Sequence, residues 1–181
     1  TGAALIRERE HGTIEHLLVM PVTPAQIMTA KVWSMGLVVL VGAAFSLTVM
    51  VQRVLHVTVH GSVALWLLAA ALHLVATTSM GIFMATVARS MPQFGLLVVL
   101  TIIPLQLLSG GTTPRESMPE AIRTLMLAAP TTHFVSASQA ILYRGAGLDI
   151  VWPQLATVLG IGTVFFTIAL RRFRGTLNRM A

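Results

Sequence analysis

Two histidines are spaced as a pair of metal ligands would be, and their chemistry is weighed first. His56 and His60 are four residues apart, which would place both side chains on one face of a helix. They flank a Val-Thr-Val segment that we expect to be a short external loop between two long apolar runs, and no carboxylate stands beside them. The chain contains no cysteine, which excludes thiolate ligands. We therefore expect no metal site in this chain.

Three polar side chains in apolar surroundings are candidates for lining a pathway through the protein. They are His73, Gln106 and His133. An ionisable residue inside an apolar membrane helix is energetically costly and usually faces the bundle interior or a wet cavity. His73, which stands near Thr77 and Thr78, fits this description. The alternative for His73 is a neutral imidazole that makes one hydrogen bond between helices.

The sequence carries no recognisable catalytic motif. It lacks an HExxH, a G-x-S-x-G and a Walker sequence, so we predict no catalytic residue. A membrane-embedded enzyme using His73 or His133 stays open as an alternative, but it lacks the paired carboxylates or nucleophile–base set of such chemistry. A secondary transporter is the other alternative. It would normally carry charged residues within its spans or an internal repeat, and we find neither.

The composition indicates that these side chains stand in a membrane protein. Hydrophobic residues make up 55% of the 181 residues, charged residues make up 10%, and the mean hydropathy is +0.83. A soluble fold of this size could not bury that much apolar surface beneath so few charges. The net charge of +6 does not indicate nucleic acid as a partner, because the basic residues stand singly between uncharged runs except near the two ends. The expected surroundings are a lipid bilayer.

Four apolar stretches approach the roughly 20 residues that a helix needs to cross the hydrocarbon core of a bilayer. They predict helices over residues of about 27–51, 63–88, 92–109 and 150–170. The predicted fold class is an all-α membrane protein with four transmembrane helices. Three pairs of small residues predict close helix packing: Gly42–Ser46, Gly81–Ala85 and Ala156–Gly160.

The distribution of Lys and Arg predicts the orientation of these helices. Eight basic residues fall on one side: Arg7, Arg9, Lys31, Arg89, Arg171, Arg172, Arg174 and Arg179. Four fall on the other side: Arg53, Arg115, Arg123 and Arg144. The side richer in Lys and Arg faces the cytoplasm. Both ends of the chain are therefore predicted to be cytoplasmic.

Two further segments are neither simple loops nor spans. Residues 1–22 contain a short amphipathic helix with Ile14, Leu17 and Leu18 on one face, which predicts an interfacial segment ahead of a transmembrane domain over residues 23–181. Residues 117–144 contain two helical pieces too short to span a bilayer and too apolar for a free loop, which predicts a re-entrant hairpin. Two capping boxes, over residues 23–26 and 117–120, are predicted to begin helices.

Several short sequences carry a resemblance to a known family. They are Glu8-Arg9-Glu10-x-Gly12-Thr13-Ile14-Glu15-x-Leu17-Leu18-Val19-x-Pro21-Val22, Pro104-x-x-x-x-Ser109-Gly110, Pro114-x-x-x-Met118-Pro119, Pro130-Thr131-Thr132-His133-Phe134 and Tyr143-Arg144-Gly145. Their order resembles the C-terminal half of the membrane (permease) subunit of a type-2 ABC exporter, within the bacterial inner-membrane permeases paired with a tandem ATPase subunit. The chain begins at Thr1 without a methionine, so we expect it to be part of a longer protein.

The resemblance implies a function for the N-terminal segment. It implies that a coupling helix contacts a separate ABC ATP-binding subunit through Gly12, Thr13, Glu15, His16, Leu17 and Leu18. ATP and Mg would be bound by that partner, and this chain would hold no cofactor. A second permease copy or a sister permease would complete a dimer, with the exported substrate passing between the two. The implied location is the bacterial inner membrane.

Overall fold

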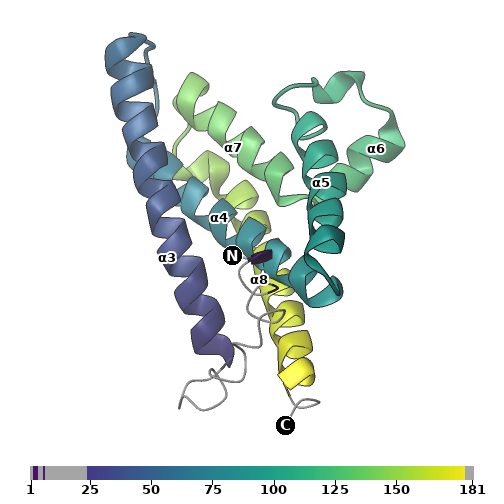
Figure 1. Cartoon of the computed structure of the whole chain (residues 1–181). Helices are drawn as coiled ribbons and strands as arrows, with labels where there is room; N and C mark the ends of the chain where they lie inside the picture. The colour runs from purple at the N-terminus through teal and green to yellow at the C-terminus, as the bar shows by residue number, and fades with distance from the viewer. Residues whose placement is uncertain (1, 4–5, 7–23, 178–181) are drawn as a thin grey trace.

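The computed structural model of the chain describes residues 2–3, 6 and 24–177, and this described part is helical with no strand. Two long helices, α4 and α8, cross at the centre, and α7 packs against both of them (Figure 1). The elements from residue 24 onward are α3 (Pro24–Phe45), the π-helix η1 (Ser46–Val54), α4 (Val63–Val87), α5 (Met91–Leu107), the short η2 (Arg115–Ser117), α6 (Glu120–Leu125), η3 (Met126–Ala128), α7 (Pro130–Arg144) and α8 (Leu148–Leu177).

The apolar runs of the sequence form the helices that were expected of them. Among the described residues, three helical stretches are long and apolar enough to cross a membrane: Val32–Val54, Val63–Val87 and Leu148–Arg172. They coincide with three of the four predicted spans. The remaining predicted span, over residues 92–109, coincides with α5. This helix is apolar but has only 17 residues, so it is shorter than the other three.

Local signals explain where several helices begin and end. The Ser62 side chain accepts a hydrogen bond from the backbone N–H of Leu65 at 3.3 Å and so caps the start of α4. Gly145 adopts a left-handed conformation with φ of 65° and ends α7. A proline stands at the first position of α3, as predicted, although Thr23 of that capping box lies outside the described residues.

The capping box predicted over residues 117–120 is wrong. Helix α6 begins at Glu120 after Pro119, and no side chain caps it. Instead, the Ser117 hydroxyl donates a hydrogen bond to the carbonyl oxygen of Pro114 at 2.7 Å. Ser117 thus stabilises the short turn before α6 instead of capping that helix.

The small residues that form the tight helix crossing are not the predicted pairs. A Cβ atom built at Gly42, Gly81 or Gly160 would meet nothing within 4 Å. A Cβ at Gly162 would lie 3.0 Å from the Cα atom of Ala76, a residue with no exposed surface. The close approach of α4 and α8 therefore depends on Gly162 and Ala76. Spacing along one helix could not show which of its small residues face a neighbour.

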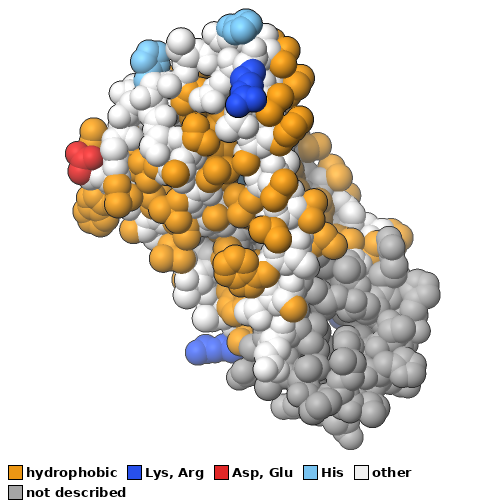
Figure 2. Space-filling model, turned by 90° about the vertical axis from the view of Figure 1, so that its left-hand side faces the viewer, with side chains coloured by type: hydrophobic (Ala, Val, Ile, Leu, Met, Phe, Trp, Pro, Cys, Tyr) orange, Lys and Arg blue, Asp and Glu red, His pale blue; other side chains and the backbone are white. Residues whose placement is uncertain are grey.

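The successive long helices run in alternating directions, as in an up-and-down bundle (Figure 1). In Figure 1 the start of α3, the connection between α4 and α5, and the end of α8 lie toward the lower end of the molecule. The segments after η1 and after α5 lie toward the upper end, together with α6. Figure 2 views the α3 side and shows a broad band of apolar side chains between charged and histidine side chains above and a basic side chain below. Trp33, Val38 and Val41 of α3 are among the exposed apolar residues.

Candidate functional site

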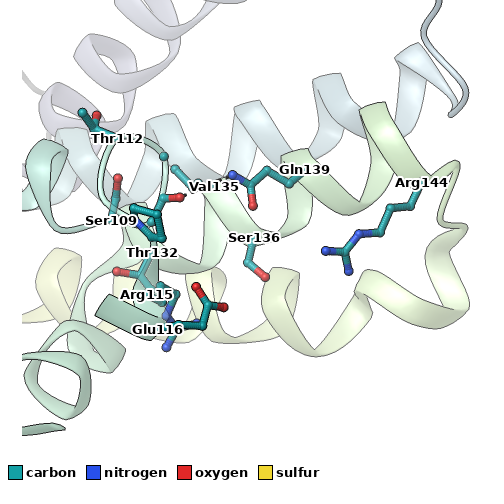
Figure 3. Close-up of a pocket in the computed structure, with 12 residues that line it drawn as sticks. Ser109, Thr112, Arg115, Glu116, Thr132, Val135, Ser136, Gln139 and Arg144 are labelled. Carbon is teal, nitrogen blue, oxygen red and sulfur yellow. Dashed lines mark hydrogen bonds between the residues drawn. The ribbon is translucent and has the colours of Figure 1, made fainter. Parts of the chain in front are cut away.

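A polar cavity of about 490 Å³ lies between the end of α5 and one face of α7. Figure 3 shows its side chains, which come from two segments about twenty residues apart in the sequence. Its walls are the 109–116 connection and the polar positions of α7. They comprise Ser109, Gly110, Gly111, Thr112, Pro114, Arg115, Glu116, Thr132, Val135, Ser136, Gln139 and Arg144.

The 109–116 connection is shaped by hydrogen bonds that side chains make to its backbone. The buried Ser109 hydroxyl donates to the carbonyl oxygen of Gln106 at 2.9 Å, which satisfies an acceptor at the end of α5. Gly110 then turns the chain with φ of +95°, a conformation that favours glycine. Gln139 of α7 donates to the Gly110 carbonyl at 3.4 Å and so ties the connection to α7.

Helix α7 presents different faces to the cavity and to the core. Thr132, Ser136 and Gln139 are spaced i, i+4 and i+7, which places them on one face, and all three line the cavity. Ala137 and Ile141 are fully buried in a cluster with Ala69 and Val151 of the neighbouring helices. Thr132 is only 1% exposed, and its Oγ1 atom has no hydrogen-bond partner in the described structure.

Three charged side chains surround the cavity. In Figure 3 the Arg144 guanidinium reaches into it from the end of α7, and the Glu116 carboxylate reaches into it from the opposite side, with Ser136 between them. Arg115 stands beside Glu116 on the connection. Within the described residues none of these three forms an ion pair. The cavity therefore offers both positive and negative groups that a bound molecule could contact.

The three predicted pathway residues lie in different places and do not line this cavity. His73 stacks on Phe134 of α7, with ring centroids 4.4 Å apart and planes 6° apart, and its buried Nδ1 has no hydrogen-bond partner in the described structure. The Nε2 atom of His133 lies 2.8 Å from the carbonyl oxygen of Leu127. Gln106 is exposed on α5. Their role in a pathway stays a prediction.

The structure describes His56 and His60 but not the predicted coupling residues. His56 and His60 lie in an irregular segment rather than on a helix, so their four-residue spacing does not place them on one helical face. No cluster of three or more metal-ligating side chains occurs among the residues that the structure describes. The predicted coupling residues Gly12, Thr13, Glu15, His16, Leu17 and Leu18 lie outside the described residues.

The cavity itself was not predicted from the sequence, although a signal for it was present. The i, i+4, i+7 spacing of Thr132, Ser136 and Gln139 gives the 130–144 helix a polar face. The predicted hairpin over residues 117–144 takes account only of the apolar residues of this helix. The sequence does not show that this polar face meets the 109–116 connection, because that contact depends on how α5 and α7 pack.

Comparison with known proteins places the chain in a family. Residues 1–143 match the family described as ABC-2 type transporter. The chain is 66% identical over 181 residues to the inner membrane transport permease YhhJ of Escherichia coli K12, covering all of this chain and 48% of that protein. It is 29% identical over 177 residues to the probable multidrug ABC transporter permease YbhR of the same organism, covering 96% of this chain and 47% of that protein. The chain thus spans about half the length of the curated relatives it matches, and it belongs to the ABC-2 type transporter family.

Proposed function

We propose that this chain is the C-terminal half of a permease subunit that exports a substrate across a bacterial inner membrane, driven by ATP hydrolysis in a separate subunit. The observation that carries the proposal is the family match over residues 1–143, on a chain whose described helices include three that are long and apolar enough to span a bilayer. The printed names of YhhJ and YbhR, both permeases, support the same function.

In this proposal the chain crosses the bilayer four times, with α5 as the shortest span. At 1.5 Å per residue, the 17 residues of α5 rise roughly 25 Å, against a hydrocarbon core of roughly 30 Å. Arg89, Arg171 and Arg172 are exposed and belong to the end of the molecule where α3 begins. The positive-inside rule then gives both ends of the chain a cytoplasmic position.

The α6–α7 segment would be the re-entrant hairpin of the outer leaflet. Helix α6 has 6 residues and α7 has 15, so neither can cross the bilayer by itself. Irregular backbone at membrane depth is tolerated where it is enclosed by protein or lines a cavity. The 109–116 connection meets this condition, because it forms one wall of the polar cavity.

The proposed coupling to ATP hydrolysis uses the N-terminal segment. Gly12, Thr13, Glu15, His16, Leu17 and Leu18 would contact the ATP-binding subunit, which would hold ATP and Mg. A second copy of the permease, or a sister permease, would complete the assembly. Closure of two ATP-binding subunits would then move two permeases against each other, so both sites would bias one equilibrium between two arrangements.

The test is purification of the intact permease from mild detergent, followed by an ATPase assay of whatever accompanies it. We expect an ATP-binding subunit to co-purify, and we expect it to be lost when residues 12–20 are scrambled. Glu15→Lys should lower the coupled ATPase activity without loss of membrane insertion. A permease that retains no ATPase, and behaves identically when residues 12–20 are scrambled, would contradict the proposal.

A further inference from the structure

The N-terminal residues that the structure describes are packed inside the bundle. Ile6 is only 1% exposed and belongs to an apolar cluster with Val32 of α3, Phe94 of α5 and Ala169 of α8. The members of this cluster from α4 are Met80, Ile82, Met84 and Ala85. In Figure 1 the N-terminus accordingly lies beside α4 and α8. The start of the chain thus shares one apolar core with four helices.

Gly2 allows the start of the chain to approach this core closely. A Cβ atom at Gly2 would lie 2.5 Å from the carbonyl oxygen of Gly81 on α4 and 2.7 Å from the ring atom Cζ of Phe94. The Gly81 carbonyl belongs to the backbone of a helix, so it cannot rotate away from an added side chain. Only glycine fits this position without a shift of α4 or α5.

Ile6 also stands close in sequence to the predicted coupling segment, residues 12–18. Gly12 follows Ile6 by six positions, and six residues of any chain extend at most about 20 Å. On the other side of the segment, the first buried residue that the structure describes is Val32, fourteen positions after Leu18. Among the described residues, Ile6 is therefore the nearer of the two buried positions that flank the coupling segment.

The other route from the coupling segment into the bundle is α3, and this helix is poorly packed against the rest of the described chain. Few residues of its apolar span are buried, and Trp33, Val38 and Val41 are all exposed. A helix with so few buried contacts can shift without displacing its neighbours, whereas a fully buried side chain cannot, because close-packed interiors have little free volume.

We propose that Gly2 and Ile6 are positioning residues that transmit movement of the coupling segment to α4, α5 and α8. The inference rests on the proposed function, which supplies the ATP-driven movement of that segment. A shift of Ile6 would act on Phe94 near the start of α5 and on Ala169 near the end of α8 together, because all three belong to one packed cluster. Movement would thus enter the bundle ahead of the coupling segment as well as through α3.

The experiment uses the intact permease purified with its ATP-binding subunit in mild detergent. It measures the amount of ATP-binding subunit retained, the change in ATPase activity that the permease causes in that subunit, and the temperature of unfolding. The test variant is Ile6→Ala, and the matched control is Ile141→Ala. Ile141 has the same side chain and is fully buried, but it belongs to the separate cluster that α7 forms with α4 and α8. Both variants remove the same atoms from a packed core, so both should lower the unfolding temperature.

The two variants should differ in coupling. Ile6→Ala should retain the ATP-binding subunit, because residues 12–18 are unchanged, but should reduce the effect of the permease on ATPase activity by about fivefold or more, as loss of coupling between two sites commonly does. Ile141→Ala should keep both properties. Gly2→Ala should act like Ile6→Ala, and Ile6→Val, which keeps most of the side chain, should restore most of the effect.

The outcomes separate this inference from the proposed function. A wild-type permease that retains no ATP-binding subunit would overturn both. If the wild type retains an active subunit but Ile6→Ala and Ile141→Ala reduce its activity equally, the proposed function stands and the inference is overturned, because lost packing alone would explain the effect. Loss of the subunit from Ile6→Ala would overturn it as well. If Ile6→Ala fails to fold, Ile6→Val and Ile141→Val make the same comparison with a smaller deletion.

Discussion

Replacing Gly162 by alanine tests the central crossing of the fold. Gly162 is buried on α8, and an added Cβ would lie 3.0 Å from the Cα atom and 3.1 Å from the Cβ atom of Ala76 on α4. Both atoms belong to or are fixed by the backbone, so no side-chain rotation can relieve the contact. The two helices would have to separate at the point where they are closest.

The size of the effect follows from comparison with Gly160, two residues earlier on the same helix. A Cβ there would meet nothing within 4 Å. Both substitutions gain the helix preference of alanine, about 0.5–1 kcal/mol. Only Gly162→Ala has the cost of overpacking, about 1–3 kcal/mol. The difference between the two variants removes the shared gain, so Gly162→Ala should be less stable than Gly160→Ala by about 1–3 kcal/mol.

Thermal unfolding of the intact permease in one detergent measures this difference. We expect Gly162→Ala to unfold at a lower temperature than the wild type, and Gly160→Ala to unfold at or above the wild-type temperature. The refuting result is a Gly162→Ala variant that unfolds no earlier than Gly160→Ala. It would mean that α4 and α8 do not approach each other at Ala76.

Three further predictions use the same thermal assay. Thr132→Val keeps the side-chain shape and removes a buried hydroxyl that has no partner in the described structure. It should therefore raise the free energy of unfolding by about 1 kcal/mol. A decrease would show that the hydroxyl is hydrogen-bonded. Ser138→Ala removes the acceptor of the Trp66 Nε1–H hydrogen bond of 3.1 Å and should cost about 0.5–1.5 kcal/mol, a loss that should disappear in a Trp66→Phe background. Gly61→Ala would overlap the Ile141 carbonyl group and should cost about 1–3 kcal/mol, and wild-type stability would contradict this contact.

The long helices were predictable because their signals are local. The apolar run predicted over 63–88 forms α4 at Val63–Val87, and the run predicted over 150–170 lies within α8 at Leu148–Leu177. Ser62 caps the start of α4, and the apolar run of α8 ends at the basic residues Arg171 and Arg172. Such signals lie next to the helix ends that they determine, so they can be recognised without knowing how the helices pack. The left-handed Gly145 that ends α7 is a signal of the same kind.

The contacts between helices were not predictable in the same way. Gly160 and Gly162 are both small residues on α8, yet only Gly162 faces α4. The difference is a rotation of about 200° around the helix axis, and hydrophobicity alone does not fix that rotation when most of the helix is apolar. The π-helical stretch Ser46–Val54 was likewise not predicted, because the sequence indicated only a span that ends at about residue 51. The polar cavity depends on two such packing choices at once.

In the proposed topology, the short length of α5 would explain why polar side chains gather at its end. As a span, the helix would fall roughly 5 Å short of the hydrocarbon thickness, so the chain would continue at that depth as irregular backbone. Backbone carbonyls there need hydrogen-bond donors from the protein, and Ser109 and Gln139 supply two of them. Glu116 and Arg144 make no such backbone contact and no ion pair among the described residues, so the satisfaction of the backbone does not explain them. Both charged side chains are exposed, so water can solvate them, and only the contacts of Ser109 and Gln139 are explained by the backbone at the end of α5.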